Sequence, residues 1–198
     1  MGHRALLAYR RDDADQRDDS TGLSGDEITS DEADFDEATS DEASYDLHRS
    51  HWGGADFALL GRLSADDPFA SETSFAVDSE PIAIDCSLTE IVGEYLDFLH
   101  HEAFYRVEPD YRTTAFHVCW FGLEADAEAV ERSETVGHGA LVEVVPENAD
   151  YFRGWFRGTK SVVGDVTDCD AFTPDEATDY LAERVTSWDE DREVILPD

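Results

Sequence analysis

Two short apolar runs, separated by a long acidic segment, constrain the fold of this chain more than any other feature. The runs are residues 4–9 (RALLAY) and 45–54 (YDLHRSHWGG), and residues 11–44 between them are mostly Asp, Glu, Ser, Thr, Ala and Gly. A segment of this composition buries too little apolar surface to offset the loss of chain entropy. We therefore expect one domain over residues 1–198, with residues 11–44 as a disordered acidic insertion. The alternative is that the insertion is a tether that binds a partner protein.

The flanking runs can still pair as a hairpin. The cost of closing a loop rises by only about 0.6 kcal/mol for each doubling of its length. With Tyr9 opposite Tyr45, the alternation of side chains places His3 and His51 on one face and His48 on the other. A register shifted by one residue would instead place His48 on the face of His3.

The chain carries a large excess of negative charge, with 48 Asp and Glu against 14 Lys and Arg and a formal net charge of −34. Lys160 is the single lysine. Self-repulsion at this charge destabilises a compact chain in dilute buffer, whereas molar salt, with a Debye length of about 3 Å, screens it. We interpret the composition as that of a cytoplasmic protein from a halophile that accumulates salt. Because phosphate backbones are bound by Lys and Arg, the charge also weighs against nucleic acid as a general partner.

The sequence offers no support for a membrane, metal or cofactor role. The N-terminus is interpreted as too short and too polar for a signal peptide, and no run of about 18 apolar residues could span a membrane. Cys86, Cys119 and Cys169 lie far apart in no metal-ligand spacing, so we interpret them as free thiols in a reducing cytosol. We expect no metal and no cofactor.

Hydrophobic patterns and turn signals divide the rest of the chain into short strands and helices. Ser87 with Glu90, and Thr173 with Pro174 and Glu176, have the pattern of helix N-termini. These signals predict an α+β domain with a mainly antiparallel or mixed sheet and two to three helices packed on it. Strands are expected at residues 57–63, 82–86, 104–107, 114–121, 139–145 and 192–196, and helices at 87–99, 124–134, 148–157 and 173–188.

Residues 1–9 (MGHRALLAY), joined to residues 45–53 (YDLHRSHWG), resemble the N-terminal motif of a family of uncharacterised haloarchaeal proteins. In that family a short turn joins the two strands, so residues 11–44 look like an insertion. The resemblance covers most of the chain outside this insertion. It implies a haloarchaeal source and a cytoplasmic location, and it implies no activity, cofactor or catalytic residue.

The histidines of the expected hairpin are the first candidate site. A zinc site needs three or four ligands at about 2.0–2.3 Å, whereas the expected register supplies two, His3 and His51. The interpretation we favour is that His3, His48, His51 and Trp52 close the end of the hairpin by packing and hydrogen bonding. In an enzyme, His51 or His3 would do acid–base work.

His117 and Cys119 lie two apart in a predicted strand and so share a face. Two residues along a strand are separated by about 6.6 Å, which is too far for a Cys–His nucleophile pair without bending. Aromatic and branched residues flank them, so we favour a role in the core over catalysis.

Residues 151–164 form the longest stretch without Asp or Glu, and they carry Arg153, Arg157 and Lys160. On a helix the two arginines are four apart and share a face. This pattern predicts an anion or phosphate site with aromatic support from Trp155 and Phe156. The alternative, which we favour, is that the cations complement a helix C-terminus and pair with local carboxylates.

Two classes of function stay open. The first, which we favour, is a small binding or regulatory protein without catalytic activity, whose partner is a protein or a small anionic ligand. The second is an enzyme that acts on a phosphate-containing small molecule or a nucleotide, with Arg153, Arg157 and Lys160 holding the anion. The second class needs the hairpin histidines and these cations in one concave pocket.

The charge imbalance predicts that folding depends on salt. We expect cooperative folding in multimolar KCl and loss of structure well below that concentration, because screening removes the self-repulsion. Thermal melts followed by circular dichroism at low and at multimolar KCl test this expectation. A midpoint that does not move with salt contradicts it.

Overall fold

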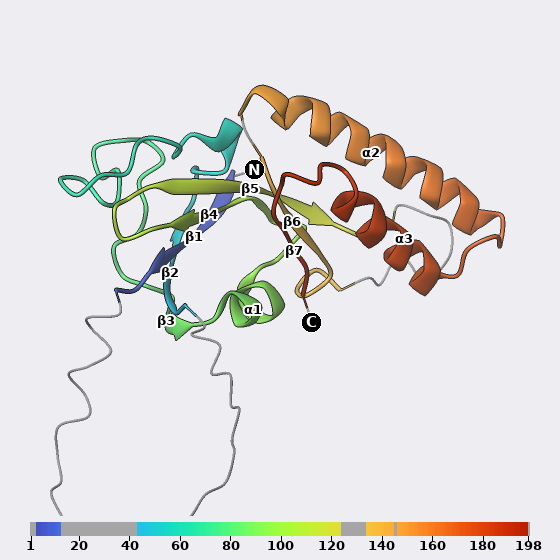
Figure 1. The fold of residues 1–198 in the computed structure, drawn as a ribbon, viewed down its shortest axis with the longest axis horizontal. Helices are drawn as coiled ribbons and strands as arrows, with labels where there is room; N and C mark the ends of the chain where they lie inside the picture. The colour runs from blue at the N-terminus through green and yellow to red at the C-terminus, as the bar shows by residue number, and fades with distance from the viewer. Residues whose placement is uncertain (1–2, 13–42, 124–133, 145, 198) are drawn as a thin grey trace, which may run out of the picture.

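The computed structural model describes residues 3–12, 43–123, 134–144 and 146–197, and these residues are built around one β-sheet. The strands within them are β1 (Arg4–Arg10), β2 (Tyr45–Ser50), β3 (Ala83–Cys86), β4 (His101–Val107), β5 (Thr113–Trp120), β6 (Gly139–Glu143) and β7 (Val194–Ile195). They lie in the order β3-β2-β1-β4-β5-β6-β7 (Figure 1). β1 and β4 are parallel, and the other neighbouring strands are antiparallel. The predicted α+β class with a mixed sheet is therefore confirmed.

β1 lies inside the sheet, between β2 and β4. Its residues Ala5, Leu6, Leu7 and Ala8 are at most 2% exposed. Ala5 and Leu7 belong to the hydrophobic core on one face of the sheet, and Leu6 and Ala8 belong to the core on the other. A strand that is buried on both faces is apolar along its length rather than alternating. This burial accounts for the unbroken ALLA run in the sequence.

Helices cover both faces of the sheet. On one face lie α2 (Pro146–Asp168), α3 (Pro174–Thr186) and the short turn of helix η2 (Ala55–Phe57). On the other face, α1 (Leu88–Glu90) continues directly into η3 (Ile91–Tyr95). Figure 1 shows α2 and α3 side by side, with α1 on the opposite side of the sheet. The sheet therefore separates two cores, each closed by a different part of the chain.

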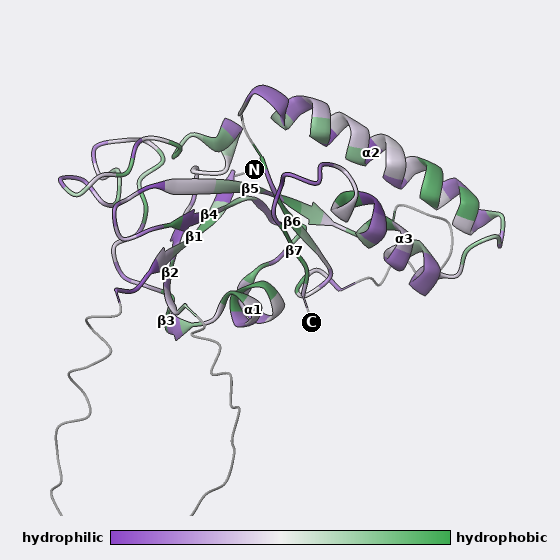
Figure 2. Ribbon diagram, viewed as in Figure 1, coloured by the Kyte–Doolittle hydropathy of each residue, from purple (hydrophilic) through white to green (hydrophobic). Residues whose placement is uncertain are grey.

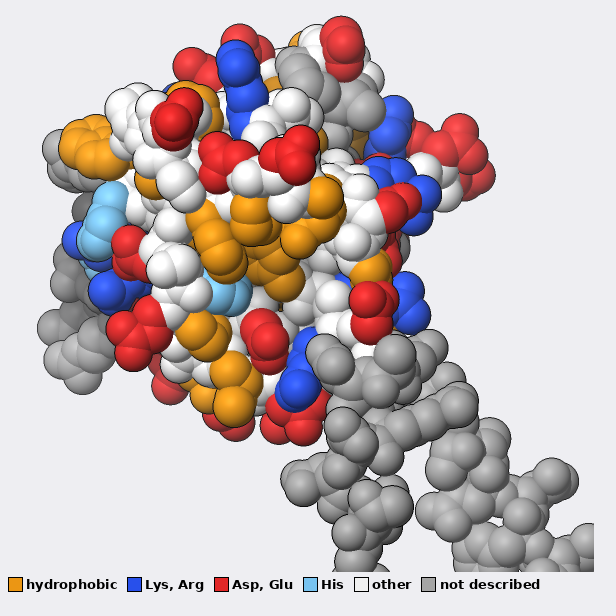
Figure 3. All heavy atoms as spheres, turned by 90° about the vertical axis from the view of Figure 1, so that its left-hand side faces the viewer, with side chains coloured by type: hydrophobic (Ala, Val, Ile, Leu, Met, Phe, Trp, Pro, Cys, Tyr) orange, Lys and Arg blue, Asp and Glu red, His pale blue; other side chains and the backbone are white. Residues whose placement is uncertain are grey.

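A loop of residues 58–81 closes the remainder of the α2 face. Leu59, Leu63 and Val77 are buried, and the partly buried Phe69 and Phe75 pack against the same core. Seen from the side of this loop, apolar side chains gather in the middle of the face with carboxylates around them (Figure 3). Figure 2 shows hydrophobic stretches in the middle of the sheet, between more hydrophilic strand ends. Hydrophobic contacts therefore hold the loop in place together with hydrogen bonds to β2, such as the one from the Ser50 hydroxyl to the Phe75 carbonyl at 2.8 Å.

The strand predicted at residues 57–63 is wrong. Asp56 and Phe57 have φ angles of 47° and 54°, and the residues that follow form turns. A left-handed backbone interrupts an extended strand, so the apolar residues of this segment reach the core from turns. The other five predicted strands correspond to β3, β4, β5, β6 and β7, with ends that differ by at most three residues.

Both predicted helix starts are confirmed. The side chains of Ser87 and Thr173 each accept a hydrogen bond from the backbone N–H three residues later. The side chains of Glu90 and Glu176 accept hydrogen bonds from the backbone N–H groups of these two cap residues. These reciprocal bonds satisfy amide groups that have no partner inside the helix. The helix that starts after Ser87 is shorter than predicted, because the backbone becomes extended at Leu96.

α2 is longer than predicted. The helix expected at residues 148–157 has 23 residues and continues past Gly158 to Asp168. Each glycine costs a helix roughly 0.5–1 kcal/mol relative to Ala, but packing of an apolar face outweighs that cost. The helix expected at residues 124–134 falls almost entirely outside the described residues. Among the described residues, no helix combines the length and the hydropathy needed to cross a membrane.

β1 and β2 pair antiparallel, so the predicted hairpin pairing is confirmed, but the predicted register is wrong by one residue. Tyr9 lies opposite Asp46 rather than Tyr45. The observed register places Tyr9 and His48 on one face with their rings 5.0 Å apart, and the Tyr9 hydroxyl donates to the Pro68 carbonyl at 2.7 Å. The predicted register was based on placing Tyr9 opposite Tyr45. Because both faces of β1 are buried, hydrophobic alternation could not select the register.

The two ends of the acidic segment meet in the sheet. The Arg11 amide donates to the Ser44 carbonyl at 2.9 Å, which continues the β1–β2 ladder beyond the strands. The disorder predicted for residues 11–44 concerns mainly residues 13–42, which lie outside the described residues.

This ladder predicts that residues 13–42 can be replaced by the dipeptide Asn-Gly. Asp12 and Ala43 are the next residues beyond the Arg11–Ser44 hydrogen bond, and a two-residue turn is the commonest connection between two antiparallel strands. We expect thermal midpoints of the two proteins in multimolar KCl to agree within about 4 °C, which corresponds to roughly 1 kcal/mol for a chain of this size. A shortened protein that is insoluble or melts well below this range contradicts the expectation.

Candidate functional site

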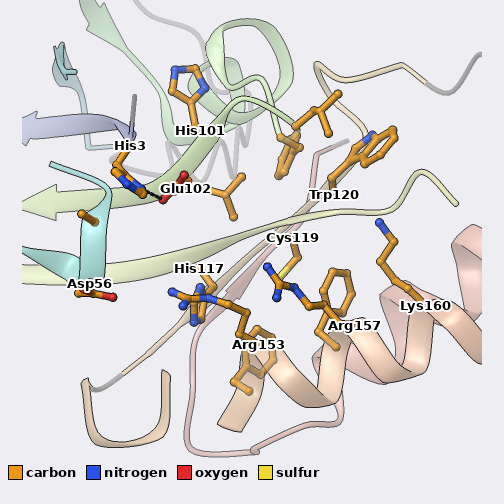
Figure 4. A pocket seen from close by; sticks show the side chains of 16 residues that line it. His3, Asp56, His101, Glu102, His117, Cys119, Trp120, Arg153, Arg157 and Lys160 are labelled. Carbon is orange, nitrogen blue, oxygen red and sulfur yellow. Dashed lines mark hydrogen bonds and ion pairs between the residues drawn. The ribbon is translucent and has the colours of Figure 1, made fainter. Parts of the chain in front are cut away.

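A cavity of about 520 Å³ lies where β4 and β5 separate. The ladder between these strands ends at the pair Ala103–His117. Beyond that pair, the start of β4 continues beside β1 and the end of β5 continues beside β6. The two strand ends therefore leave a space between them. Side chains from α2, from η2 and from the residue before β1 line the rest of this space (Figure 4).

Three cations of α2 form one wall of the cavity: Arg153, Arg157 and Lys160. Their spacing of four and three residues places them on one side of the helix. Phe152 and Phe156 on the same helix are buried in the core, so they fix the rotation of α2. Figure 4 shows the arginines and the lysine extending from α2 towards the sheet. The stripe predicted from the sequence therefore lines a single cavity.

The three cations differ in their partners. Arg153 forms an ion pair with Asp150, less than one turn earlier, at 3.2 Å. The Lys160 ammonium lies 4.7 Å from the centre of the Trp120 ring, which is a cation–π distance. Arg157 forms no ion pair within the residues that the structure describes, and its side chain lines the cavity. The pairing with local carboxylates that the sequence suggested thus applies to Arg153 and not to Arg157.

The side of the cavity away from α2 carries carboxylates and histidines. Nδ1 of His3 and Oε2 of Glu102 are 2.6 Å apart, and both side chains are about half exposed. His101, next to Glu102 in β4, is hydrogen-bonded to the Asp97 backbone, and burial lowers the pKa of its imidazole. Asp56 of η2 also lines the cavity, and Figure 4 shows it level with His117 and Arg153. The cavity therefore combines the cationic wall of α2 with two carboxylates, one from β4 and one from η2.

A glycine brings η2 close enough to line the cavity. The Gly54 amide donates to the His3 carbonyl at 2.8 Å. A Cβ atom at Gly54 would lie 2.6 Å from the Arg4 carbonyl oxygen, so a side chain at this position would displace the strand. The end of the HWGG motif thus serves a close approach of two backbones. This approach brings Asp56 and His3 to the same cavity.

The structure brings one of the two predicted acid–base residues to the cavity. His3 lines it, whereas His51 is exposed and lies outside its lining. The ring contacts of His3 are with Trp52, at 6.1 Å, and its hydrogen bond is with Glu102. His3 and His51 therefore do not form the joint site that the predicted register required. His48 is buried elsewhere, with Nδ1 2.9 Å from the Asp78 carbonyl oxygen.

His117 and Cys119 belong to the core beside the cavity. His117 is 5% exposed, its Nε2 donates to the Ala149 carbonyl at 3.0 Å, and its ring packs against Phe57 and Phe152. Cys119 is 2% exposed, and burial raises the pKa of its thiol. A buried thiol that holds its proton is a poor nucleophile. The geometry therefore supports the packing role that the sequence favoured.

Within the described residues, no three His, Cys, Asp or Glu side chains are placed to hold a metal ion. His3 with Glu102, and His100 with Asp97, form pairs without a third ligand nearby. The donors of the cavity are arginines, a lysine and hydrogen-bonded pairs, which suit an anionic organic group better than a cation such as zinc.

Sequence reasoning missed Asp56, Glu102 and Trp120. Glu102 is one of 48 acidic residues, so its type carried no signal. Asp56 follows the Gly53–Gly54 pair, and that adjacency was a usable signal for a close backbone approach. Trp120 alternates with core residues in β5, which favoured a packing role for it. Their shared position at the cavity depends on the residue at which β4 and β5 separate. Local sequence patterns do not predict that point.

The burial of His117 predicts an acid-sensitive stability. Desolvation lowers the pKa of this imidazole from 6.5 to about 4, although its hydrogen bond to Ala149 opposes the shift. Because the unfolded chain binds this proton more tightly, stability is lost as the pH falls from 6.5 towards 4. The full loss amounts to about 3 kcal/mol.

His117→Gln keeps an N–H donor but does not titrate. Between pH 7 and pH 4.5, we expect its free energy of unfolding to fall by about 2–3 kcal/mol less than that of the wild type. Urea unfolding of both proteins in multimolar KCl measures the difference. His51→Gln serves as the control, since it removes an exposed histidine. Equal pH dependence in wild type and His117→Gln contradicts the assignment.

The comparison with known families concerns most of the residues that form the cavity. A family model described as "Family of unknown function (DUF6735)" matches residues 70–196, which is more than half of the chain. The matched region includes β4, β5 and α2, while His3 and Asp56 precede it. No curated protein and no solved structure matches the chain. The chain therefore belongs to the family of unknown function DUF6735.

Proposed function

We propose that this protein binds a small anionic ligand, with a phosphate or carboxylate group, in the cavity between α2 and the diverging ends of β4 and β5. It acts as a binding or regulatory protein. The observation that carries the proposal is the gathering of Arg153, Arg157 and Lys160 on one wall of one cavity. The chain has only 14 basic residues against 48 acidic ones, so a concentration of cations in a hollow is a departure from its general surface.

The chemistry of the wall suits such a ligand. A guanidinium presents parallel N–H groups that match two oxygens of a phosphate or carboxylate, and such charge-assisted bonds are stronger than neutral ones. Arg157 has no ion-pair partner within the described residues, so binding a ligand does not first require an internal pair to break. The ring of Trp120 holds Lys160 by a cation–π contact at 4.7 Å. The lysine is thereby held at the cavity before the ligand arrives.

A second candidate is an enzyme that acts on a phosphate-containing small molecule or a nucleotide. The observation in its favour is that His3 lies in the same cavity as the cations and pairs with Glu102 at 2.6 Å. A carboxylate that accepts from Nδ1–H leaves Nε2 as a free acceptor, which is the form of a general base. The partner histidine expected for this role, His51, is not in the lining.

We further propose that the protein is salt-adapted, haloarchaeal and cytoplasmic, as its charge and its N-terminal motif suggest. In multimolar KCl the Debye length is about 3 Å or less, so distant carboxylates hardly weaken the field of the cationic wall. Direct contacts between Arg157 and a bound anion are screened much less. Binding that persists at high salt is therefore an expected property of this site.

Binding is tested with ethyl phosphate, followed by ³¹P NMR titration in multimolar KCl. We expect Arg157→Gln to weaken binding by about tenfold, because a hydrogen bond to a charged group contributes about 1.5–3 kcal/mol. Arg62→Gln is the matched control, since Arg62 is exposed and lies outside the cavity.

Equal affinities in Arg157→Gln and Arg62→Gln, or no binding by the wild type, would contradict the proposal. The same spectra separate the two candidate functions, because hydrolysis would add a resonance of inorganic phosphate. A turnover that His3→Gln abolishes while binding persists would favour the enzyme.

A further inference from the structure

We propose that the ligand of this cavity is a zwitterion, with an anionic group on the α2 wall and an ammonium group at the carboxylates of Asp56 and Glu102. This inference rests on the proposed function, because it assigns the second end of the same ligand. It follows from the opposite charges that line the cavity, and from the left-handed backbone and unpaired carboxylate of Asp56 within the described residues. A purely anionic ligand would satisfy the cations but not the carboxylates.

Asp56 is held in the cavity by an unusual backbone. Its φ and ψ angles are 47° and 31°, and the next residue, Phe57, has a φ of 54°. Left-handed conformations are rare outside glycine, although Asp and Asn tolerate them better than most residues. Such conformations persist only where the surrounding structure imposes them, and they cluster at ligand sites. Here the surrounding structure is identifiable, because Phe57 is buried and packs edge-on against His117 at 4.9 Å.

Among the residues that the structure describes, the Asp56 carboxylate has no cationic partner. Within the described residues it forms no hydrogen bond and no ion pair, although Arg153 and Arg157 line the same cavity. Figure 4 shows its carboxyl group directed towards the interior of the cavity. In a chain with 48 acidic side chains, most carboxylates are solvated at the surface. Asp56 is exposed as well, but a left-handed turn places it in the lining of a hollow that also holds cations.

Glu102 gives the cavity a second carboxylate. Its Oε2 lies 2.6 Å from Nδ1 of His3, and an imidazole that donates here leaves the other lone pairs of the carboxylate free. Asp56 and Glu102 come from different elements, η2 and β4, and line the same cavity. An ammonium group has three donors and no acceptor, so it suits a site lined by carboxylates. A hydroxyl group would satisfy neither charge.

The size of the cavity agrees with a ligand that reaches both the cations and the carboxylates. A volume of about 520 Å³ holds a small molecule of several heavy atoms and excludes a peptide or a polymer as its full occupant. An anion that entered without a counter-charge would be bound beside two carboxylates and would desolvate them, which is unfavourable. A cation without an anionic group would face Arg157. A ligand with both charges avoids both costs.

The test compares O-phosphoethanolamine with ethyl phosphate, which lacks only the ammonium group. Both are titrated into the full-length protein in multimolar KCl with EDTA present, so that a divalent cation cannot replace the ammonium group. We expect the wild type to bind O-phosphoethanolamine about tenfold more tightly, since a charge-assisted contact of about 1.5–3 kcal/mol corresponds to tenfold or more. Asp56→Asn should remove this preference while leaving the affinity for ethyl phosphate equal or slightly higher.

Two further variants make the result decisive. Asp56→Gly removes the carboxylate at a backbone position that glycine adopts without strain, so it guards against a folding defect in Asp56→Asn. Asp66→Asn removes an exposed carboxylate outside the cavity and should keep the full preference. Equal binding of the two probes by the wild type overturns the zwitterion and leaves anion binding intact. A preference that survives in both Asp56 variants overturns the role of Asp56. If neither probe binds to the wild type, the proposed function itself is overturned.

Discussion

The burial of β1 between β2 and β4 is the constraint on which the rest of the structure depends. This strand pairs antiparallel with a segment 35 or more residues later and parallel with β4, so it joins the N-terminal part of the chain to the remainder of the sheet. Its side chains supply both cores, because Leu7 faces α2 and α3 while Leu6 faces α1 and η3. Loss of the strand would expose apolar surface on both faces, so neither layer of helices could remain packed.

The position of the candidate site follows from the point at which the pairing of β4 with β5 ends. The parallel partner β4 starts beside β1 and joins β5 only from Ala103 onwards, so a space opens between the ends of β4 and β5. Gly54 allows η2 to approach the start of β1, which places Asp56 at one side of the space. The buried aromatic face of α2 sets the helix rotation that turns Arg157 towards the other side. Elements that are distant in the sequence thus provide opposite charges around a single cavity.

Local signals in the sequence predicted local structure well. The capping residues Ser87 and Thr173 start helices as expected, and the apolar runs of the sheet form strands. Predictions that needed long-range information were less successful. The β1–β2 register was shifted by one residue because a strand buried on both faces carries no alternation to align. The expected strand at residues 57–63 is absent because its apolar residues pack from turns. Of the predicted site residues, the α2 cations and His3 meet at one cavity, whereas His51 does not.

The sequence by itself determined the acidic character of the chain, the α+β class, the starts of its helices and the cationic stripe of α2. These properties depend on composition or on residues a few positions apart, so they can be identified without a partner. Only the tertiary structure decided that the stripe faces Glu102 and Asp56, and that Asp56 is directed inwards by a left-handed turn. Such juxtapositions depend on strand order and on where two strands separate. Both are set by packing of the whole chain, and no local pattern encodes them.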